Sequence, residues 1–252
     1  MKWLSTARDL KRRKARERHG LFVAEGVRTV EELARSPLVI EAVLCTARAA
    51  AEDRSAAAMR TLGDRGVPRF EVSEAEFESA ADTENPQGLL AIARQPRRAL
   101  DALPVRATLR LLVLDAIQDP GNVGTLVRTA AGLGADAALA LPGTVDLWNA
   151  KVVRSAVGAQ FHFPVAEVEL PELEAYLARH QIALWAGDAQ GTPIASVEAP
   201  ARLAVAVGNE GAGLSAALRA RCSTVVSLPM SPAVESFNVA VAAGIILYAL
   251  RP

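Results

Sequence analysis

The sequence predicts an α/β protein in which a small α/β domain precedes a larger domain built on a parallel sheet. From residue 109 onward, short apolar runs alternate with stretches of helical character, the pattern of strands joined by crossover helices. Residues 1–96 show the same alternation on a smaller scale. With 252 residues, 51% of them hydrophobic, the chain is long enough to bury two modest cores.

Residues 1–96 are expected to form the smaller domain, which lies within the usual domain size range. Strands are predicted at 21–26, 41–45, 69–72 and 88–93, and helices at 27–35 and 47–62. Ser73 is followed three residues later by Glu76, the spacing of a capping box. A further helix is therefore expected to begin after Ser73.

Residues 97–108 are interpreted as the linker between the two domains. The segment holds Pro104 and three arginines, Arg97, Arg98 and Arg106, and it shows no sustained periodicity. The larger domain is accordingly predicted to span residues 109–252.

The larger domain is expected to carry a parallel sheet covered by helices on both faces. Strands are predicted at 109–114, 137–141, 182–186, 203–207 and 225–228, and helices at 123–132, 171–179, 215–221 and 238–250. In such folds ligands bind at the carboxyl ends of the strands. The helix at 238–250 is apolar nearly all round, so either its own domain or a second subunit must bury it.

The sequence argues against three classes of protein: membrane proteins, secreted proteins and metal-dependent proteins. The run 239–250 is shorter than the ~20 residues of a membrane span and contains Gly244. The charged N-terminus lacks the apolar core of a secretory signal. Cys45 and Cys222 have neither metal nor disulfide spacing, and the three histidines form no cluster, so no metal is expected. A reducing, cytoplasmic setting follows.

Formal charge is zero overall but unevenly distributed. Residues 1–20 hold eight lysines and arginines against two acidic residues, a net charge of +6 that leaves −6 for the remainder. The centre of this run contains Lys11, Arg12, Arg13, Lys14 and Arg16. Such a run can contact nucleic-acid phosphates, or it can be a solubilising, partly disordered tail. Charge alone leaves both interpretations open.

Three short segments that contain glycine or asparagine residues follow apolar runs in the larger domain. The first, residues 115–128, contains a turn sequence and then Asn122, which stands where a helix N-cap is expected. Arg128 lies on the second turn of that helix. Free N–H groups beside an arginine suit a phosphate or a ribose. The alternative is a capped helix with a solvated arginine.

The second segment, residues 207–214, places three glycines around the single carboxylate of Glu210, directly after a predicted strand. Such a loop allows a ligand to approach the backbone closely. The alternative is an ordinary glycine-rich turn.

The third segment, residues 228–238, begins where a predicted strand ends. It brings Ser236, Phe237 and Asn238 to the start of the apolar helix. Ser236 has a simple structural interpretation as the N-cap of that helix. A buried helix behind a polar loop also describes the wall of a ligand site.

In order and spacing these three segments resemble the three motifs of the SpoU/TrmH branch of the SPOUT RNA methyltransferases, and the resemblance covers nearly the whole chain. It implies a C-terminal SPOUT domain with a trefoil knot, S-adenosylmethionine as cofactor and a homodimer. The implied reaction transfers a methyl group to the 2′-oxygen of a ribose in RNA. Phe237 stands where a leucine is more usual, and Ala240 where a small hydroxyl residue often lies.

The resemblance also implies which residues form the site. The implied catalytic residues are Asn122, Arg128, Glu210, Ser236 and Asn238. The implied cofactor contacts are Gly208, Leu228, Met230 and Phe237. Arg154, between the first and second motifs, is implied as an RNA contact, and it joins Lys11, Arg12, Arg13, Lys14 and Arg16 as the predicted RNA-binding residues.

Methyl transfer to a hydroxyl also requires loss of its proton. The family account favours the first-motif arginine, here Arg128, as base or relay. Because a guanidinium stays protonated at neutral pH, we expect Arg128 instead to position the ribose and an adjacent phosphate. Glu210 is expected to orient Arg128 or to serve as the alternative proton acceptor.

The N-terminal domain favours a large folded substrate. Residues 12–26 and 85–88 resemble the substrate-binding domain that often precedes the catalytic domain in this family. Ribosomal RNA is therefore expected rather than transfer RNA. An antibiotic-resistance rRNA methyltransferase and a non-catalytic RNA-binding or assembly protein of the same fold are the alternatives. A nicotinamide-dependent oxidoreductase is excluded because no glycine fingerprint opens the first helix of the larger domain.

Overall fold

The computed structural model describes residues 1–96, 99–231, 233 and 236–251. Contacts divide the chain into two units, the first formed by Met1–Arg97 with Trp148–His162 and the second by Arg98–Leu147 with Phe163–Pro252. Arg97 and Arg98 of the predicted linker lie outside the described residues. Among the described helices, none is long and apolar enough to cross a membrane.

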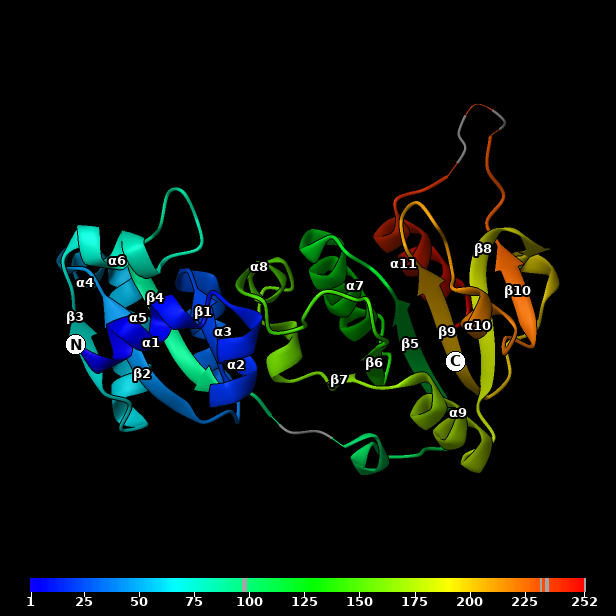
Figure 1. The fold of residues 1–252 in the computed structure, drawn as a ribbon, viewed down its shortest axis with the longest axis horizontal. Helices are drawn as coiled ribbons and strands as arrows, with labels where there is room; N and C mark the ends of the chain where they lie inside the picture. The colour runs from blue at the N-terminus through cyan, green and yellow to red at the C-terminus, as the bar shows by residue number, and fades with distance from the viewer. Residues whose placement is uncertain (97–98, 232, 234–235, 252) are drawn as a thin grey trace. The chain divides into compact units, whose positions relative to one another are not determined.

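The first unit is built on a four-stranded mixed sheet of order β1-β4-β2-β3, drawn in blue to blue-green in Figure 1. β4 pairs antiparallel with both β1 and β2, and β3 pairs parallel with β2. The strands are β1 (Leu21–Glu25), β2 (Ile40–Cys45), β3 (Arg69–Glu71) and β4 (Leu89–Arg94). The helices are α1 (Lys2–Asp9), α2 (Arg13–His19), α3 (Val27–Arg35), α4 (Ala47–Ala51), α5 (Asp53–Asp64), α6 (Glu74–Ala80) and α8 (Ala150–Ser155).

The basic N-terminal run is folded rather than a disordered tail. It forms α1 and α2, and Leu4, Ala7 and Leu10 are buried in a cluster with Phe77 of α6. The predicted capping box is present, because Ser73 and Glu76 exchange both hydrogen bonds at the start of α6. An apolar stripe on α1 therefore fixes where the basic side chains lie.

The expected continuous helix over 47–62 is wrong. The chain forms α4 and then α5, and Glu52 between them is extended, with φ −80° and ψ 127°. Helical propensity alone does not reveal this break, since alanines surround it. Thr46 caps α4 by accepting a hydrogen bond from the N–H of Ala49 at 3.2 Å.

Residues from the middle of the chain complete the core of the first unit. Phe22 of β1 is fully buried, and its ring centroid lies 4.6 Å from that of Trp148 and 5.6 Å from that of Phe161. Trp148 and Phe161 flank α8, which also contacts β1. The segment 148–162 therefore contributes to the N-terminal unit, although the predicted division at 97–108 assigns it to the larger domain.

The second unit is built on a six-stranded sheet of order β10-β8-β9-β5-β6-β7, in which every strand pair is parallel as predicted (Figure 1, green to orange). The strands are β5 (Leu109–Asp115), β6 (Ala137–Ala140), β7 (Val165–Glu167), β8 (Ala183–Pro193), β9 (Arg202–Gly208) and β10 (Thr224–Ser227). The helices are α7 (Pro120–Gly132), α9 (Leu170–Arg179), α10 (Ala216–Arg219) and α11 (Val239–Ala249). Short 3₁₀ turns are η1 (Leu100–Ala102), η2 (Ala159–Phe161, in the first unit) and η3 (Ile194–Ser196).

β5 lies at the point where the order of the strands reverses. All seven of its residues are buried, as expected of a strand covered on both faces. From β5 the chain continues to β6 and β7 on one side, and the strands that follow lie on the other side. Asp115 at the end of β5 pairs in register with Gly208 at the end of β9. The first two glycine-rich segments therefore leave neighbouring strands at the switch point, where α/β proteins bind ligands.

A buried arginine anchors the far end of the last helix to this sheet. Arg110 of β5 is only 6% exposed. Its guanidinium donates to the backbone oxygen of Leu250 at 2.6 Å and to those of Ala201 and Leu109 at 2.7 and 2.9 Å. Burial lowers the pKa of Arg110 below its ordinary value. Because α11 ends at Ala249, the guanidinium satisfies a carbonyl that the helix itself leaves unpaired.

We expect Arg110→Met to lower the free energy of unfolding by about 3 kcal/mol, because buried carbonyl groups lose their donors. Urea unfolding followed by circular dichroism measures this change. Arg106→Met is the matched control, since Arg106 is exposed and its ion pair with Asp136 contributes little. Equal stabilities for the two variants would contradict the anchoring role.

Candidate active site

A cavity of about 580 Å³ lies at the carboxyl ends of β9 and β10, against the middle of β8 and beside the start of α11. Its volume is in the range of small-molecule sites. It combines apolar walls with backbone turns and a few polar side chains. The lining residues are 187–189, 207–211, Gly213, Val226, Leu228, Met230, 236–239, Ala242 and Ile246.

Most of the predicted catalytic and cofactor-binding residues line this cavity. All four predicted cofactor contacts are present, namely Gly208, Leu228, Met230 and Phe237. Of the predicted catalytic residues, Glu210, Ser236 and Asn238 line it. Asn122 reaches it through hydrogen bonds to two of these side chains, whereas Arg128 is exposed on α7 and is not among the lining residues.

Helix α7 begins within the first segment, and it starts at a different residue from the one predicted. Asp119, not Asn122, caps α7, and its carboxylate accepts the N–H of Asn122 at 2.8 Å. Pro120 occupies the first helical position, which suits its missing N–H. The expectation of an Asn122 cap failed because Asp119 stands at the position that precedes this proline. Asn122 consequently keeps its side chain free for contacts outside the helix.

The Asn122 amide joins the second and third segments. Its Nδ2 donates to Oε1 of Glu210 at 2.9 Å, and its Oδ1 accepts from Nδ2 of Asn238 at 2.9 Å. An asparagine side chain can donate and accept at once, which neither a carboxylate nor a lysine can do. One amide therefore holds all three predicted motifs together.

Asn238 also starts the last helix. Its Oδ1 accepts from the N–H groups of Ala240 and Val241 at 2.9 and 3.3 Å, so Asn238 is the N-cap of α11. The interpretation of Ser236 as the cap is therefore wrong, and Ser236 lines the cavity instead. Phe237 is 39% exposed and lines the same cavity.

Asn209 determines the shape of the second segment, a role that was not predicted from the sequence. Its Oδ1 accepts from the N–H groups of Gly211 and Ala212, both at 3.0 Å. Its Nδ2 donates to the backbone oxygen of Ala116 at 3.0 Å. The side chain of an asparagine before a glycine turn commonly forms a hydrogen bond with the backbone two residues ahead. The Asn-Glu-Gly sequence at 209–211 could therefore have predicted this role for Asn209.

Glycine is required at position 208 because the loop returns against it. A Cβ built on Gly208 would lie 2.2 Å from the carbonyl carbon of Gly213. Directly after the neighbouring strand β5, Ala116 has a φ of +57°, a value uncommon for a residue with a side chain. This backbone accepts the Asn209 hydrogen bond. Asp115, also buried, accepts the N–H of Ser215 at 2.6 Å and so fixes the start of α10.

Glu210 is held as an anion. Partial burial raises the pKa of its carboxyl, but the hydrogen bond from Asn122 and bonds from nearby backbone groups outweigh burial, and the net pKa is lowered. A carboxylate with a lowered pKa is a weak proton acceptor, which favours a positioning role for Glu210 over a role as the base. Arg128 makes no hydrogen bond or ion pair with any described residue, so it is not oriented by Glu210 here.

The predicted RNA-binding residues of the basic N-terminal run divide into two groups. Lys11, Arg12, Arg13 and Lys14 are exposed. Arg16 is 3% exposed and donates to the backbone oxygens of Leu10 and Lys11 at 2.7 and 2.9 Å. The prediction of Arg16 as an RNA contact is therefore wrong for this structure. Its guanidinium serves carbonyls in the turn that follows α1.

Arg154 is engaged within the first unit. It forms an ion pair with Asp82 at 3.3 Å and lies 4.0 Å from the buried carboxylate of Glu25. Glu25 in turn accepts the N–H of Asp82 at 2.7 Å. An RNA contact by Arg154 remains a prediction, and these acidic partners compete with a phosphate for it.

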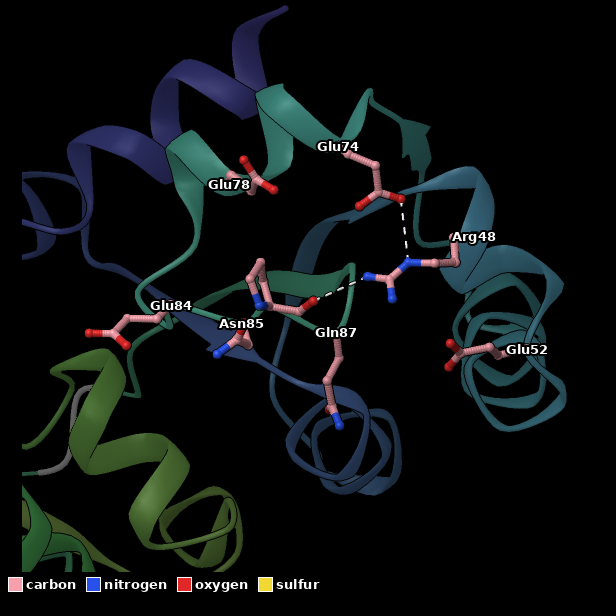
Figure 2. Close-up of a pocket in the computed structure, with 8 residues that line it drawn as sticks. Arg48, Glu52, Glu74, Glu78, Glu84, Asn85 and Gln87 are labelled. Carbon is pink, nitrogen blue, oxygen red and sulfur yellow. Dashed lines mark hydrogen bonds and ion pairs between the residues drawn. The ribbon is translucent and has the colours of Figure 1, made fainter.

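A second cavity, of about 380 Å³, lies in the first unit around the predicted motif 85–88. Its lining residues are Arg48, Glu52, Glu74, Glu78, Glu84, Asn85, Pro86 and Gln87. Arg48 has two partners, the carboxylate of Glu74 at 3.6 Å and the backbone oxygen of Pro86 at 3.3 Å. Figure 2 shows Arg48 pointing toward Glu74 at the edge of this cavity. Four glutamates around one already paired arginine do not suit an RNA phosphate.

The fold and the first cavity define a class of protein, an α/β enzyme with a small-molecule site at the carboxyl ends of a parallel sheet. The family is more specific. A model of the SpoU rRNA Methylase family matches residues 110–248, and a model of the MRM3-like substrate binding domain matches residues 4–91. The chain belongs to the SpoU rRNA Methylase family.

The chain aligns with individual relatives over nearly its full length. The chain is 36% identical to the 23S rRNA (guanosine(2553)-2′-O)-methyltransferase RlmP of Bacillus subtilis, over 97% of this chain and 94% of that protein. It is 28% identical to the 23S rRNA (uridine(2479)-2′-O)-methyltransferase of Streptomyces viridochromogenes, over 94% and 84%. The crystal structure of AviRb from Streptomyces viridochromogenes with AdoMet superposes with a TM-score of 0.90 at 26% identity, covering 98% and 96%.

The lowered pKa of Glu210 gives a testable pH dependence. A carboxylate with a lowered folded-state pKa adds stability above its unfolded pKa and loses it as pH falls through the folded value. We expect the side-chain amide NMR signals of Asn122 and Asn238 to stay constant as the pH falls from neutral, and to move only once the pH is below the range in which an ordinary glutamate takes up its proton. In Glu210→Gln this transition should be absent, and a transition near neutral pH in the native protein would contradict the assignment.

Proposed function

We propose that this protein is an S-adenosylmethionine-dependent RNA 2′-O-methyltransferase that modifies ribosomal RNA. The observation that carries the proposal is the joining of three separate segments by Asn122 at one cavity, in a chain of the SpoU rRNA Methylase family. A decayed, non-catalytic relative would have no need to retain the linked side chains of Glu210 and Asn238.

The cavity suits the proposed cofactor. Leu228, Met230 and Phe237 provide apolar and aromatic surface for an adenine ring and a thioether chain. The turn around Gly208 exposes backbone near the same space, so polar groups of the cofactor are within reach of N–H and C=O groups. The cofactor would supply the methyl group bound to a positively charged sulfur.

The protein then has to hold the ribose in line with that methyl group and exclude water. Asn122, Glu210 and Asn238 keep the three loops in one arrangement through their hydrogen bonds. Arg128 is exposed and unpaired among the described residues, so it is available to the ribose and an adjacent phosphate of the RNA. Because a guanidinium stays protonated, Arg128 acts by position and charge, and the hydroxyl proton leaves late in the transfer.

The substrate is proposed to be 23S ribosomal RNA, because the two named relatives methylate 23S rRNA at the ribose. The exposed residues Lys11, Arg12, Arg13 and Lys14 would contact its phosphates, within the part of the chain that matches a substrate-binding domain. Such an enzyme works where ribosomes are assembled, which supports a cytoplasmic location.

The protein is also proposed to be a homodimer with a knotted C-terminal unit, as its resemblance to SPOUT enzymes implies. A groove between α7 and α11 is lined by Thr129, Gly132, Leu133, Gly244, Ile245 and Tyr248. Val241, Ile245 and Tyr248 are 51%, 42% and 54% exposed. Large apolar side chains gathered on one helix face indicate a protein interface. A symmetric dimer covers such a face with a second copy of itself.

We expect Ile245→Asp to convert the dimer to a monomer in light-scattering chromatography, because a charge would be buried at the centre of the interface. Val39→Asp is the matched control, since Val39 is 57% exposed in the first unit. A native protein that is monomeric at micromolar concentration would contradict the dimer.

The reaction is tested by transfer of a tritiated methyl group from S-adenosylmethionine to total RNA that lacks the modification, followed by mapping of the product. We expect a 2′-O-methylated nucleotide in 23S rRNA. A product in transfer RNA alone would support that alternative substrate. Cofactor and RNA binding without any incorporation would support the assembly-protein alternative.

Arg128→Lys provides the matched variant in the same assay. Lysine keeps the charge but loses the planar fork, so we expect activity at neutral pH to fall by about tenfold or more while cofactor binding is unchanged. Near-native activity would remove the need for a guanidinium at this position.

A further inference from the structure

Asp188 is a charged residue of the cavity that neither the motifs nor the catalytic proposal uses. It lies within β8, directly after Gly187, and lines the cavity together with Glu210. These two are the ionisable side chains among the described lining residues, and both are acidic. The remaining walls are apolar or uncharged.

The Asp188 carboxylate is held in place from two sides. Its Oδ1 accepts the N–H of Gln190 at 2.9 Å, and its Oδ2 forms an ion pair with Nη1 of Arg219 from α10. Arg219 is not among the lining residues, so the carboxylate is the member of the pair that the cavity presents. A carboxylate accepts at about four lone-pair positions, and these two contacts leave capacity for a ligand.

Glu210 is committed elsewhere. One of its oxygens accepts from Asn122 and the other from Asn209, at 2.9 and 3.4 Å. It therefore belongs to the network that joins the three segments. Asp188 is the lining carboxylate that this network does not use.

We propose that Asp188 is the anionic contact for a positively charged group of the cofactor. This inference depends on the proposed function, which places S-adenosylmethionine in the cavity. That molecule carries two cationic groups, the sulfonium and the α-ammonium. A cation that leaves water for an apolar cavity needs a partner of opposite charge, and Asp188 is fixed in place to be that partner.

Isothermal titration of the full-length protein with three adenosine ligands tests the proposal. S-adenosylmethionine carries both cations, S-adenosylhomocysteine keeps the ammonium alone, and 5′-methylthioadenosine has neither. We expect Asp188→Asn to weaken S-adenosylmethionine binding by about ten- to a hundredfold and to leave methylthioadenosine binding unchanged. The uncharged ligand thus reports whether the cavity itself is intact.

The homocysteine ligand identifies the cationic group. If its binding falls as much as that of S-adenosylmethionine, Asp188 contacts the ammonium. If its binding is unaffected, Asp188 contacts the sulfonium and favours substrate over demethylated product. Asp101→Asn is the matched control, because Asp101 forms a similar ion pair with Arg179 in the same unit but does not line the cavity.

Two results would overturn the proposal. Unchanged S-adenosylmethionine binding in Asp188→Asn would show that its charge is not used, and equal weakening of all three ligands would show a purely structural role. Failure of the native protein to bind S-adenosylmethionine is a separate outcome, which would overturn the proposed cofactor and this contact with it.

Discussion

The hydrogen-bonded row Asn238–Asn122–Glu210 is the interaction on which the site depends. Each of the three loops is rich in glycine or polar residues and has no apolar core to hold its shape. The sheet brings the loops to the same edge through the pairing of Asp115 with Gly208, but strand register fixes only where each loop begins. The amide of Asn122 then decides how the loops face one another. The side chains that hold the loops together are thus the same ones to which the proposed function assigns the chemistry.

The parallel sheet and the composition of the cavity could be predicted because both are local in the sequence. Apolar runs mark buried strands, and glycines mark the loops that leave them. The helix caps were harder, since Asp119 and Asn122, or Ser236 and Asn238, are each good capping residues a few positions apart. Only the backbone geometry selects between them. The three-residue strand β7 is too short to give a periodic signal.

Arginine shows why charge counting has limited power in this chain. Arg16 and Arg110 are both buried, and each gives its guanidinium to backbone carbonyls rather than to a ligand. Arg154 is paired with acidic groups of its own unit. In sequence these three look like the exposed Arg12 or Arg128. Their different roles come from tertiary burial, because five N–H donors on a planar group suit carbonyl clusters as well as phosphates.

The placement of residues 148–162 in the first unit has a consequence for synthesis on the ribosome. Phe22 finds its two aromatic neighbours only at Trp148 and Phe161, more than a hundred residues later in the chain. The N-terminal unit therefore cannot complete its core when only residues 1–96 have emerged from the ribosome. It has to wait until β5, α7 and β6 of the other unit have been made. Folding of the two units is coupled in time, and the nascent chain carries an unfinished aromatic core for much of its synthesis.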